Sequence, residues 1–142
     1  MTFDDVLVRW QKAKTRSARH RLCAPCSIEH EYKGTQFGHP STYAFVRFDC
    51  EPADEFTLDV TATWPANLTA DYRHLLIDAV SAAIVDVLFA ADSPHLGCAL
   101  TCTEVRWDDV GSSEAAFYRA TKEAMTALRD KEKWSALTRT RP

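Results

Sequence analysis

The sequence predicts an α+β fold, a two-layer sandwich in which two helices cover a four-stranded, mostly antiparallel sheet, with an extra helix at the N-terminus. Two observations predict it. The segments follow the order helix, three strands, helix, strand and helix, and the strands share one apolar face that two helices can cover. The chain has 142 residues, of which 46% are hydrophobic and 11% aromatic, so one domain with a buried core is expected.

The N-terminal element, residues 1–22, is predicted to be a short amphipathic helix that continues into a basic arm. Thr2 and Asp5 have the spacing of a capping box, and the apolar residues that follow have helical spacing: Phe3, Val6, Leu7 and Trp10. No acidic residue occurs between residues 9 and 21, where the chain carries Arg9, Lys12, Lys14, Arg16, Arg19 and Arg21. These cations predict either an arm that binds phosphates or a solvated helix end whose charges complement the helix dipole.

A cluster of thiols and imidazoles follows, in the pattern His20-x-x-Cys23-Ala-Pro-Cys26-x-x-x-His30. Two thiolates and two imidazoles are ligands that tetrahedral zinc accepts, although their close spacing strains a closed site. A redox pair is a further interpretation, but a redox CxxC motif opens a helix, whereas residues 27–32 alternate as a strand does. Ordinary reduced thiols are favoured, because the five cysteines of the chain are an odd number that does not suit a disulfide framework.

Three strands are expected before the long helix. The first covers about residues 27–32 and leads into a loop over residues 33–42, whose tip carries Gln36, Phe37 and His39. The other two strands, residues 43–51 and 55–64, are joined by the turn Pro52-Ala53-Asp54. The second of them alternates as an antiparallel strand with one buried face does. His39 is expected to be a solvated loop histidine, since no nucleophile partners it in the sequence.

Two helices and a strand complete the domain. Thr69 is a suitable N-cap for a helix over residues 69–88 with a wide apolar face, and residues 98–107 are predicted to form a strand. Ser112 or Ser113 can cap the last helix, whose apolar face is formed by Phe117, Ala120, Ala124 and Leu128. The predicted organisation is therefore a domain over residues 23–134, followed by a basic tail over residues 135–142.

Charge is distributed unevenly along the chain. Residues 1–50 hold eight Lys and Arg against five Asp and Glu, residues 51–114 hold two against twelve, and residues 115–142 hold seven against three. This excludes a uniformly basic nucleic-acid surface but leaves a local basic face made from both ends. No apolar run approaches the roughly 20 residues of a membrane helix, and no signal peptide is present, so a cytoplasmic location is expected. No nucleotide-binding or catalytic motif indicates a reaction.

Several segments occur in the order of a known family. Glu31-Tyr32-Lys33 leads into a glycine-containing loop, a strand ends in Glu51-Pro52, and Pro65 precedes Tyr72 and an apolar run. Most specific is Asp109-Val110-Gly111-Ser112-Ser113-Glu114-Ala115-Ala116-Phe117, which is similar to the family pattern D-V-D-S-S-E-x-A-F. From about Ile28 to Leu128 the chain thus resembles domain IV of translation elongation factor G and its ribosome-protection relatives. That domain belongs to the superfamily named after the second domain of ribosomal protein S5.

The resemblance implies a module whose tip loops enter the ribosomal decoding site beside transfer RNA. It places the tips at residues 36–42 and 107–111, so Gln36, His39, Trp107 and Asp108 become candidate ribosome- or RNA-binding residues. The chain departs from the family where Asp108 replaces the tip histidine, and where the first loop keeps two glycines without an arginine between them. The acidic tip disfavours RNA phosphates, and the family's GTP-binding domain has no counterpart here, so GTPase activity is not expected.

Three functions remain as expectations. The first is a non-enzymatic ribosome- or RNA-associated module that uses the tips and the basic arm residues Lys12, Lys14, Arg16, Arg19 and Arg21. The second is a protein-interaction or self-assembling module, suggested by the acidic middle of the chain. The third is a small zinc-dependent enzyme with the candidate ligands His20, Cys23, Cys26 and His30, for which no acid, base and nucleophile can be named together.

Overall fold

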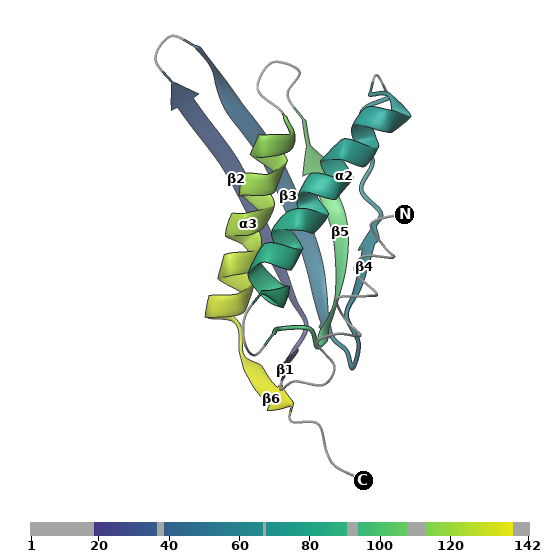
Figure 1. The fold of residues 1–142 in the computed structure, drawn as a ribbon, viewed down its shortest axis with the longest axis vertical. Helices are drawn as coiled ribbons and strands as arrows, with labels where there is room; N and C mark the ends of the chain where they lie inside the picture. The colour runs from purple at the N-terminus through teal and green to yellow at the C-terminus, as the bar shows by residue number, and fades with distance from the viewer. Residues whose placement is uncertain (1–18, 37–38, 67, 91–93, 108–112, 138–142) are drawn as a thin grey trace.

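The computed structural model describes residues 19–36, 39–66, 68–90, 94–107 and 113–137, with the backbone alone at residues 19, 34–36, 39–42, 136 and 137. Its elements in chain order are β1 (Arg19–Leu22), β2 (Cys26–Gln36), β3 (His39–Pro52), β4 (Thr57–Val60), α2 (Ala70–Ile84), the π-helix η1 (Val85–Phe89), β5 (Cys98–Arg106), α3 (Glu114–Lys131) and β6 (Trp134–Leu137). Helices α2 and α3 lie side by side on one face of a four-stranded sheet (Figure 1). The expected α+β architecture is therefore confirmed.

The four-stranded sheet has the order β2-β3-β5-β4. Strands β2, β3 and β5 pair antiparallel, whereas β4 pairs parallel to β5. The predicted antiparallel strand over residues 55–64 is thus wrong in direction and shorter than expected. The cause is burial: the helix-facing side chains of β5 are fully buried, so β5 takes the central place beside β3. Leu58 and Val60 of β4 are only half-buried, which suits an edge strand.

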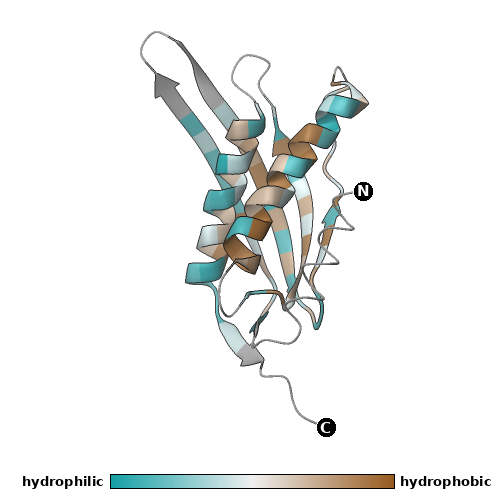
Figure 2. Ribbon diagram, in the orientation of Figure 1, coloured by the Kyte–Doolittle hydropathy of each residue, from teal (hydrophilic) through white to brown (hydrophobic). Residues whose placement is uncertain are grey.

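The core lies between the sheet and the two helices. On β3, Val46, Phe48 and Cys50 face the helices and are buried, while Arg47 and Asp49 on the other face are exposed. This alternation is the one that the sequence predicts. Hydrophobic residues follow β3, β5 and α2, whereas the outer side of α3 is hydrophilic (Figure 2). No helix among the described residues is long and apolar enough to cross a membrane.

The two long helices begin where the sequence predicts. The Thr69 hydroxyl accepts a hydrogen bond from the Tyr72 amide at 3.2 Å, and the Ser113 hydroxyl accepts one from the Ala116 amide at 3.2 Å. Each cap satisfies one of the amides that a helix leaves unpaired at its start. The π-helix η1 that extends α2 is not predicted, because an apolar run of this kind has no sequence signal for the wider turn.

Strands β1 and β6 form a second, two-stranded sheet, in which they pair antiparallel. Arg19–Leu22 is therefore a strand and not the end of the predicted N-terminal helix, and Trp134–Leu137 is a strand and not the start of a free tail. The helix predicted for residues 1–18 and the tail over residues 138–142 lie outside the described residues. The boundaries predicted at residues 22 and 135 cut through this sheet, because the pairing joins segments over 110 residues apart.

Candidate functional site

Strand β1, near the N-terminus, lies beside strand β6, near the C-terminus. Arg19 pairs with Leu137, and Leu22 pairs with Trp134. The chain therefore enters β1 and leaves β6 at neighbouring positions. The segment before Arg19 carries Arg9, Lys12, Lys14 and Arg16, and the segment after Leu137 carries Arg139 and Arg141. We call this part of the molecule, β1 and β6 with the last turn of α3, the basic end.

The last turn of α3 adds cations that the structure describes. Lys131 and Lys133 are exposed, whereas the Arg129 guanidinium is held by Asp130, with Nε 2.9 Å from Oδ1. The hydrogen bond that Arg129 donates to Asp130 raises the pKa of Arg129 and lowers the pKa of Asp130. Among the described residues, Lys131 and Lys133 have no ion-pair partner, whereas Arg129 is paired with Asp130.

Strand β1 is fastened to the domain by backbone hydrogen bonds. The His20 amide donates to the Pro94 carbonyl at 2.8 Å, and the Gly97 amide donates to the His20 carbonyl at 2.9 Å. The Leu22 amide donates to the Gly97 carbonyl at 3.0 Å, and the Leu22 side chain is only 1% exposed. These hydrogen bonds fix β1 to the domain. We call the segment that makes them, residues 94–97, the seat of β1.

Gly97 leaves no room for a side chain beneath β1. A Cβ atom at this position would lie 2.5 Å from the Arg21 Cα and 2.7 Å from the Arg21 Cβ. We expect Gly97→Ala to lower the free energy of unfolding by about 1–3 kcal/mol, because the backbone of β1 must shift. Urea denaturation measures this loss, with Arg73→Ala on an exposed turn of α2 as the control, for which a change within about 0.5 kcal/mol is expected. Equal stability of the two variants would contradict the seat at Gly97.

Arg21, a predicted phosphate-binding residue, has a structural role in the fold. Its Nε donates to the Ala53 carbonyl at 3.3 Å and lies 3.5 Å from the Asp54 carboxylate, and its side chain is 39% exposed. Successive side chains of a strand point to opposite sides, and on β1 the side of Arg21 faces the turn between β3 and β4. The role of Arg21 in phosphate binding stays a prediction. The side chains of Lys12, Lys14, Arg16 and Arg19 lie outside the described ones.

Three rings join the basic end to the rest of the domain. His20 of β1 stacks on His95, with ring centroids 4.4 Å apart and planes inclined by 22°. His95 meets Trp134 of β6 edge to face, with centroids 4.9 Å apart at 87°. The indole of Trp134 donates to the Leu128 carbonyl at 3.1 Å. We call His20, His95 and Trp134 the ring stack. Neither His95 nor its contact with Trp134 has a local sequence signal.

His95 is held in its neutral form. Burial lowers its pKa to about 4, and the neighbouring His20 and Arg129 act in the same direction, with Asp130 opposing them. The buried Nδ1 atom of His95 has no hydrogen-bond partner among the described residues. An imidazole that is half-buried and next to two other potential cations binds a proton poorly.

The predicted zinc ligands do not converge. His20 stacks on His95, Cys23 is exposed between β1 and β2, and Cys26 and His30 lie four residues apart on one strand. Four strand residues span about 13 Å, whereas zinc holds its ligand atoms at about 2.0–2.3 Å. No group of three or more His, Cys, Asp or Glu side chains in the described part of the chain is arranged to hold a metal ion. The extended course of β2 is the physical reason that this prediction is wrong.

The thiols of the sheet are poor nucleophiles. Burial raises the pKa of Cys26 to about 11, with Glu132 adding to the effect, and burial raises the pKa of Cys102 to about 12. Cys26 lies directly opposite Cys50 in the β2–β3 register, and burial raises the pKa of Cys50 further still. Because the thiolate is the reactive form, these cysteines are suited to packing rather than to catalysis.

The tip residues that the resemblance implies are only partly described. Gln36 and His39 pair at the end of the β2–β3 hairpin, but their side chains lie outside the described ones, as does Asp108 altogether. Trp107 is turned to the interior. Its ring lies 6.1 Å from that of Phe117 and 5.6 Å from that of Tyr72, so it packs against the starts of α2 and α3.

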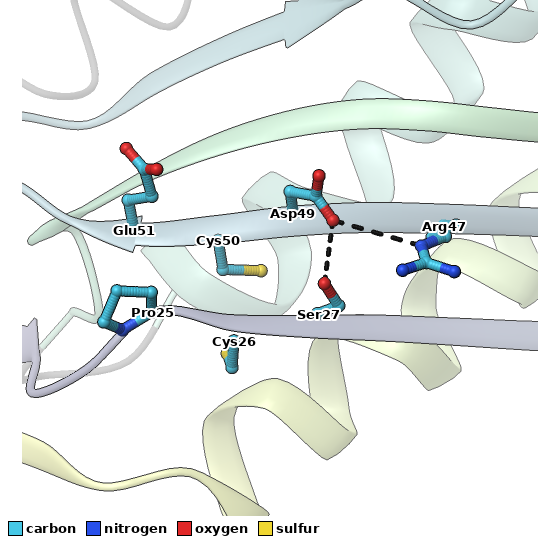
Figure 3. Close-up of a pocket in the computed structure, with 7 residues that line it drawn as sticks. All are labelled: Pro25, Cys26, Ser27, Arg47, Asp49, Cys50 and Glu51. Atoms are coloured by element: carbon cyan, nitrogen blue, oxygen red, sulfur yellow. Dashed lines mark hydrogen bonds and ion pairs between the residues drawn. The ribbon is translucent and has the colours of Figure 1, made fainter.

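An open hollow of about 390 Å³ lies where β2 begins and β3 ends (Figure 3). It is lined by Pro25, Cys26, Ser27, Arg47, Asp49, Cys50 and Glu51. The Ser27 hydroxyl donates to the Asp49 carboxylate at 2.8 Å, and the Arg47 Nε lies 3.9 Å from the same oxygen. These polar groups already satisfy one another, and burial raises the pKa of both thiols in the lining, Cys26 and Cys50. The hollow therefore indicates no reaction.

Comparisons with known proteins relate the chain to solved structures by fold. No family model matches the chain, and no curated protein does. A crystal structure of a protein from Thermus thermophilus matches with a TM-score of 0.65 and 20% sequence identity. The match covers 86% of this chain but 18% of the Thermus protein, so this chain spans about a fifth of that protein's length. The similarity establishes a shared fold and nothing about activity.

Proposed function

We propose that this chain is a non-enzymatic, translation-factor-like module with the fold of elongation factor G domain IV, in the superfamily of the second domain of ribosomal protein S5. In this proposal it acts in the cytoplasm and binds the ribosome or RNA through its basic end. The observation that carries the proposal is the pairing of Arg19 with Leu137, which brings strand β1 to the strand that follows the exposed Lys131 and Lys133. The resemblance of residues 28–128 to domain IV supports the choice of partner.

The distribution of charge favours the basic end over the sheet. Among the described residues, the face of the sheet opposite α2 and α3 carries six carboxylates, Glu29, Glu31, Asp49, Glu51, Asp59 and Glu104, against three cations, Lys33, Arg47 and Arg106. Arg106 is itself held by Glu104, with Nε 2.7 Å from Oε2. An acidic face repels phosphates, whereas clustered Lys and Arg bind them and release counterions. RNA is therefore expected at the basic end and not on the open sheet face.

Co-sedimentation with ribosomes at two salt concentrations tests the proposal. If about five phosphates are contacted, a fourfold rise from 50 to 200 mM salt should weaken binding by roughly 100-fold. Retention at 50 mM with this steep loss is the expected result, and excess heparin, an unstructured polyanion, shows how much of the binding is unspecific. No binding at 50 mM salt would contradict the proposal.

A protein-interaction module of the same fold is the second candidate. It is favoured by the acidic open face of the sheet, because carboxylates attract a basic protein surface and repel the phosphates of RNA. Size-exclusion chromatography with light scattering and pull-down from extract at moderate salt distinguish the two. A stoichiometric protein partner together with failure to bind ribosomes would favour this candidate.

A further inference from the structure

We propose that the ring stack of His20, His95 and Trp134 is an acid-sensitive latch, which holds strands β1 and β6 on the domain and loosens when His95 is protonated. The latch is a property of the fold and does not depend on the proposed binding of RNA. It concerns β1, β6 and the segment between η1 and β5, and it leaves the four-stranded sheet unchanged.

Each ring of the stack comes from a different segment. His20 belongs to β1 and Trp134 belongs to β6. His95 lies between Pro94 and Gly97, whose backbones form hydrogen bonds with the backbone of β1. His95 lies in the middle, 4.4 Å from the ring of His20 and 4.9 Å from that of Trp134. A change in His95 therefore reaches both chain ends at once.

The surroundings of His95 oppose a positive charge. His20 and Arg129 are the neighbours that disfavour protonation, and Asp130 favours it. Arg129 donates a hydrogen bond to the Asp130 carboxylate at 2.9 Å, so Asp130 stabilises a proton on His95 less than an unpaired carboxylate does. Two stacked imidazoles at 4.4 Å are tolerated when neutral but repel each other when both carry a proton.

The direction of the pH effect follows from proton linkage. The pKa of His95 is lowered from an ordinary 6.5 to about 4 by burial first, then by His20 and Arg129. A released latch thus binds a proton more readily than a closed one at pH values between these two. The free energy that favours the closed form is fully present above about pH 6.5 and decreases as the pH falls toward 4. Because the ring is partly open to solvent, we expect about a tenfold shift toward the released form between pH 7 and 5, less than full linkage gives.

Amide hydrogen exchange measured by NMR at pH 7 and pH 5 tests the latch. The amides of His20, Leu22 and Gly97 are hydrogen-bonded across the seat. After correction for intrinsic exchange, their protection should fall about tenfold at pH 5, while that of Val46 and Phe48 in the central strand β3 stays constant. No nucleic acid is present, so the result is independent of the proposed function.

Two variants identify the titrating group. His95→Gln removes the proton site and should make the protection of the His20 and Leu22 amides independent of pH, whereas His74→Gln on an exposed turn of α2 should leave the tenfold change intact. Should His95→Gln release β1 at every pH, an NMR titration of His95 in the unaltered chain decides. A midpoint well below 6 supports the latch. A midpoint near 6.5, or equal protection at pH 7 and 5 in the unaltered chain, would overturn it.

Discussion

Replacing Lys12, Lys14 and Arg16 together with glutamine is expected to weaken ribosome or RNA binding by roughly 100-fold at 50 mM salt. These residues precede Arg19 in the sequence, Arg19 pairs with Leu137, and Arg139 and Arg141 follow Leu137, so we expect both sets of charges to meet the same partner. Each lost phosphate contact also removes about one unit or less from the slope of log affinity against log salt. Affinity measured at several salt concentrations therefore reports both the loss and its electrostatic origin.

A matched variant separates position from net charge. Lys33, Arg73 and Arg119 are exposed and lie near the hairpin end of β2 and in the first turns of α2 and α3. Those parts of the elements are at the end of the domain opposite to β1 and β6 (Figure 1). Replacing the three with glutamine removes the same charge and should change affinity less than about threefold, since only charges within about 10 Å act strongly. Equal losses in the two variants would count against a local basic end.

Phe117→Ala is expected to cost about 3–5 kcal/mol of unfolding free energy, the largest effect of any single substitution considered. The side chain is completely buried and lies at the start of α3, with its ring 5.6 Å from that of Trp64 and 6.1 Å from that of Trp107. Its removal leaves a cavity that these two indoles cannot fill. Urea denaturation measures the loss, with Leu75→Ala as a control because Leu75 is 44% exposed. A cost for Phe117→Ala no larger than that for Leu75→Ala would contradict the described packing.

The sequence predicts the parts of this fold that depend on local pattern. Helical spacing identifies α2 and α3 with their caps, and alternation identifies the buried face of β3, because both signals come from neighbouring residues. The insertion of β5 between β3 and β4, and the pairing of β1 with β6, depend on contacts between distant segments. Such contacts are decided by total burial and chain connectivity, which no local window contains.

The candidate site is predicted to a smaller extent. Charge counting identifies both basic segments but cannot show that the strands next to them in the sequence, β1 and β6, pair with each other. Arg21 has the same charge as its neighbours in sequence, yet the turn at Asp54 engages it. Cysteine and histidine spacing suggests zinc, but the strand geometry of β2 separates Cys26 from His30. His95 becomes important only because β1 and β6 bring His20 and Trp134 to it.

The central claim, that both basic segments meet one partner site, is tested most directly by photo-crosslinking to ribosomes. A photoreactive residue is placed at position 16 in one variant and at position 139 in another, on either side of the Arg19–Leu137 pair. We predict that both variants crosslink to the same short stretch of ribosomal RNA or to nucleotides adjacent in space. Crosslinks to distant parts of the ribosome, or crosslinks from neither position under conditions where the chain co-sediments, would contradict the account.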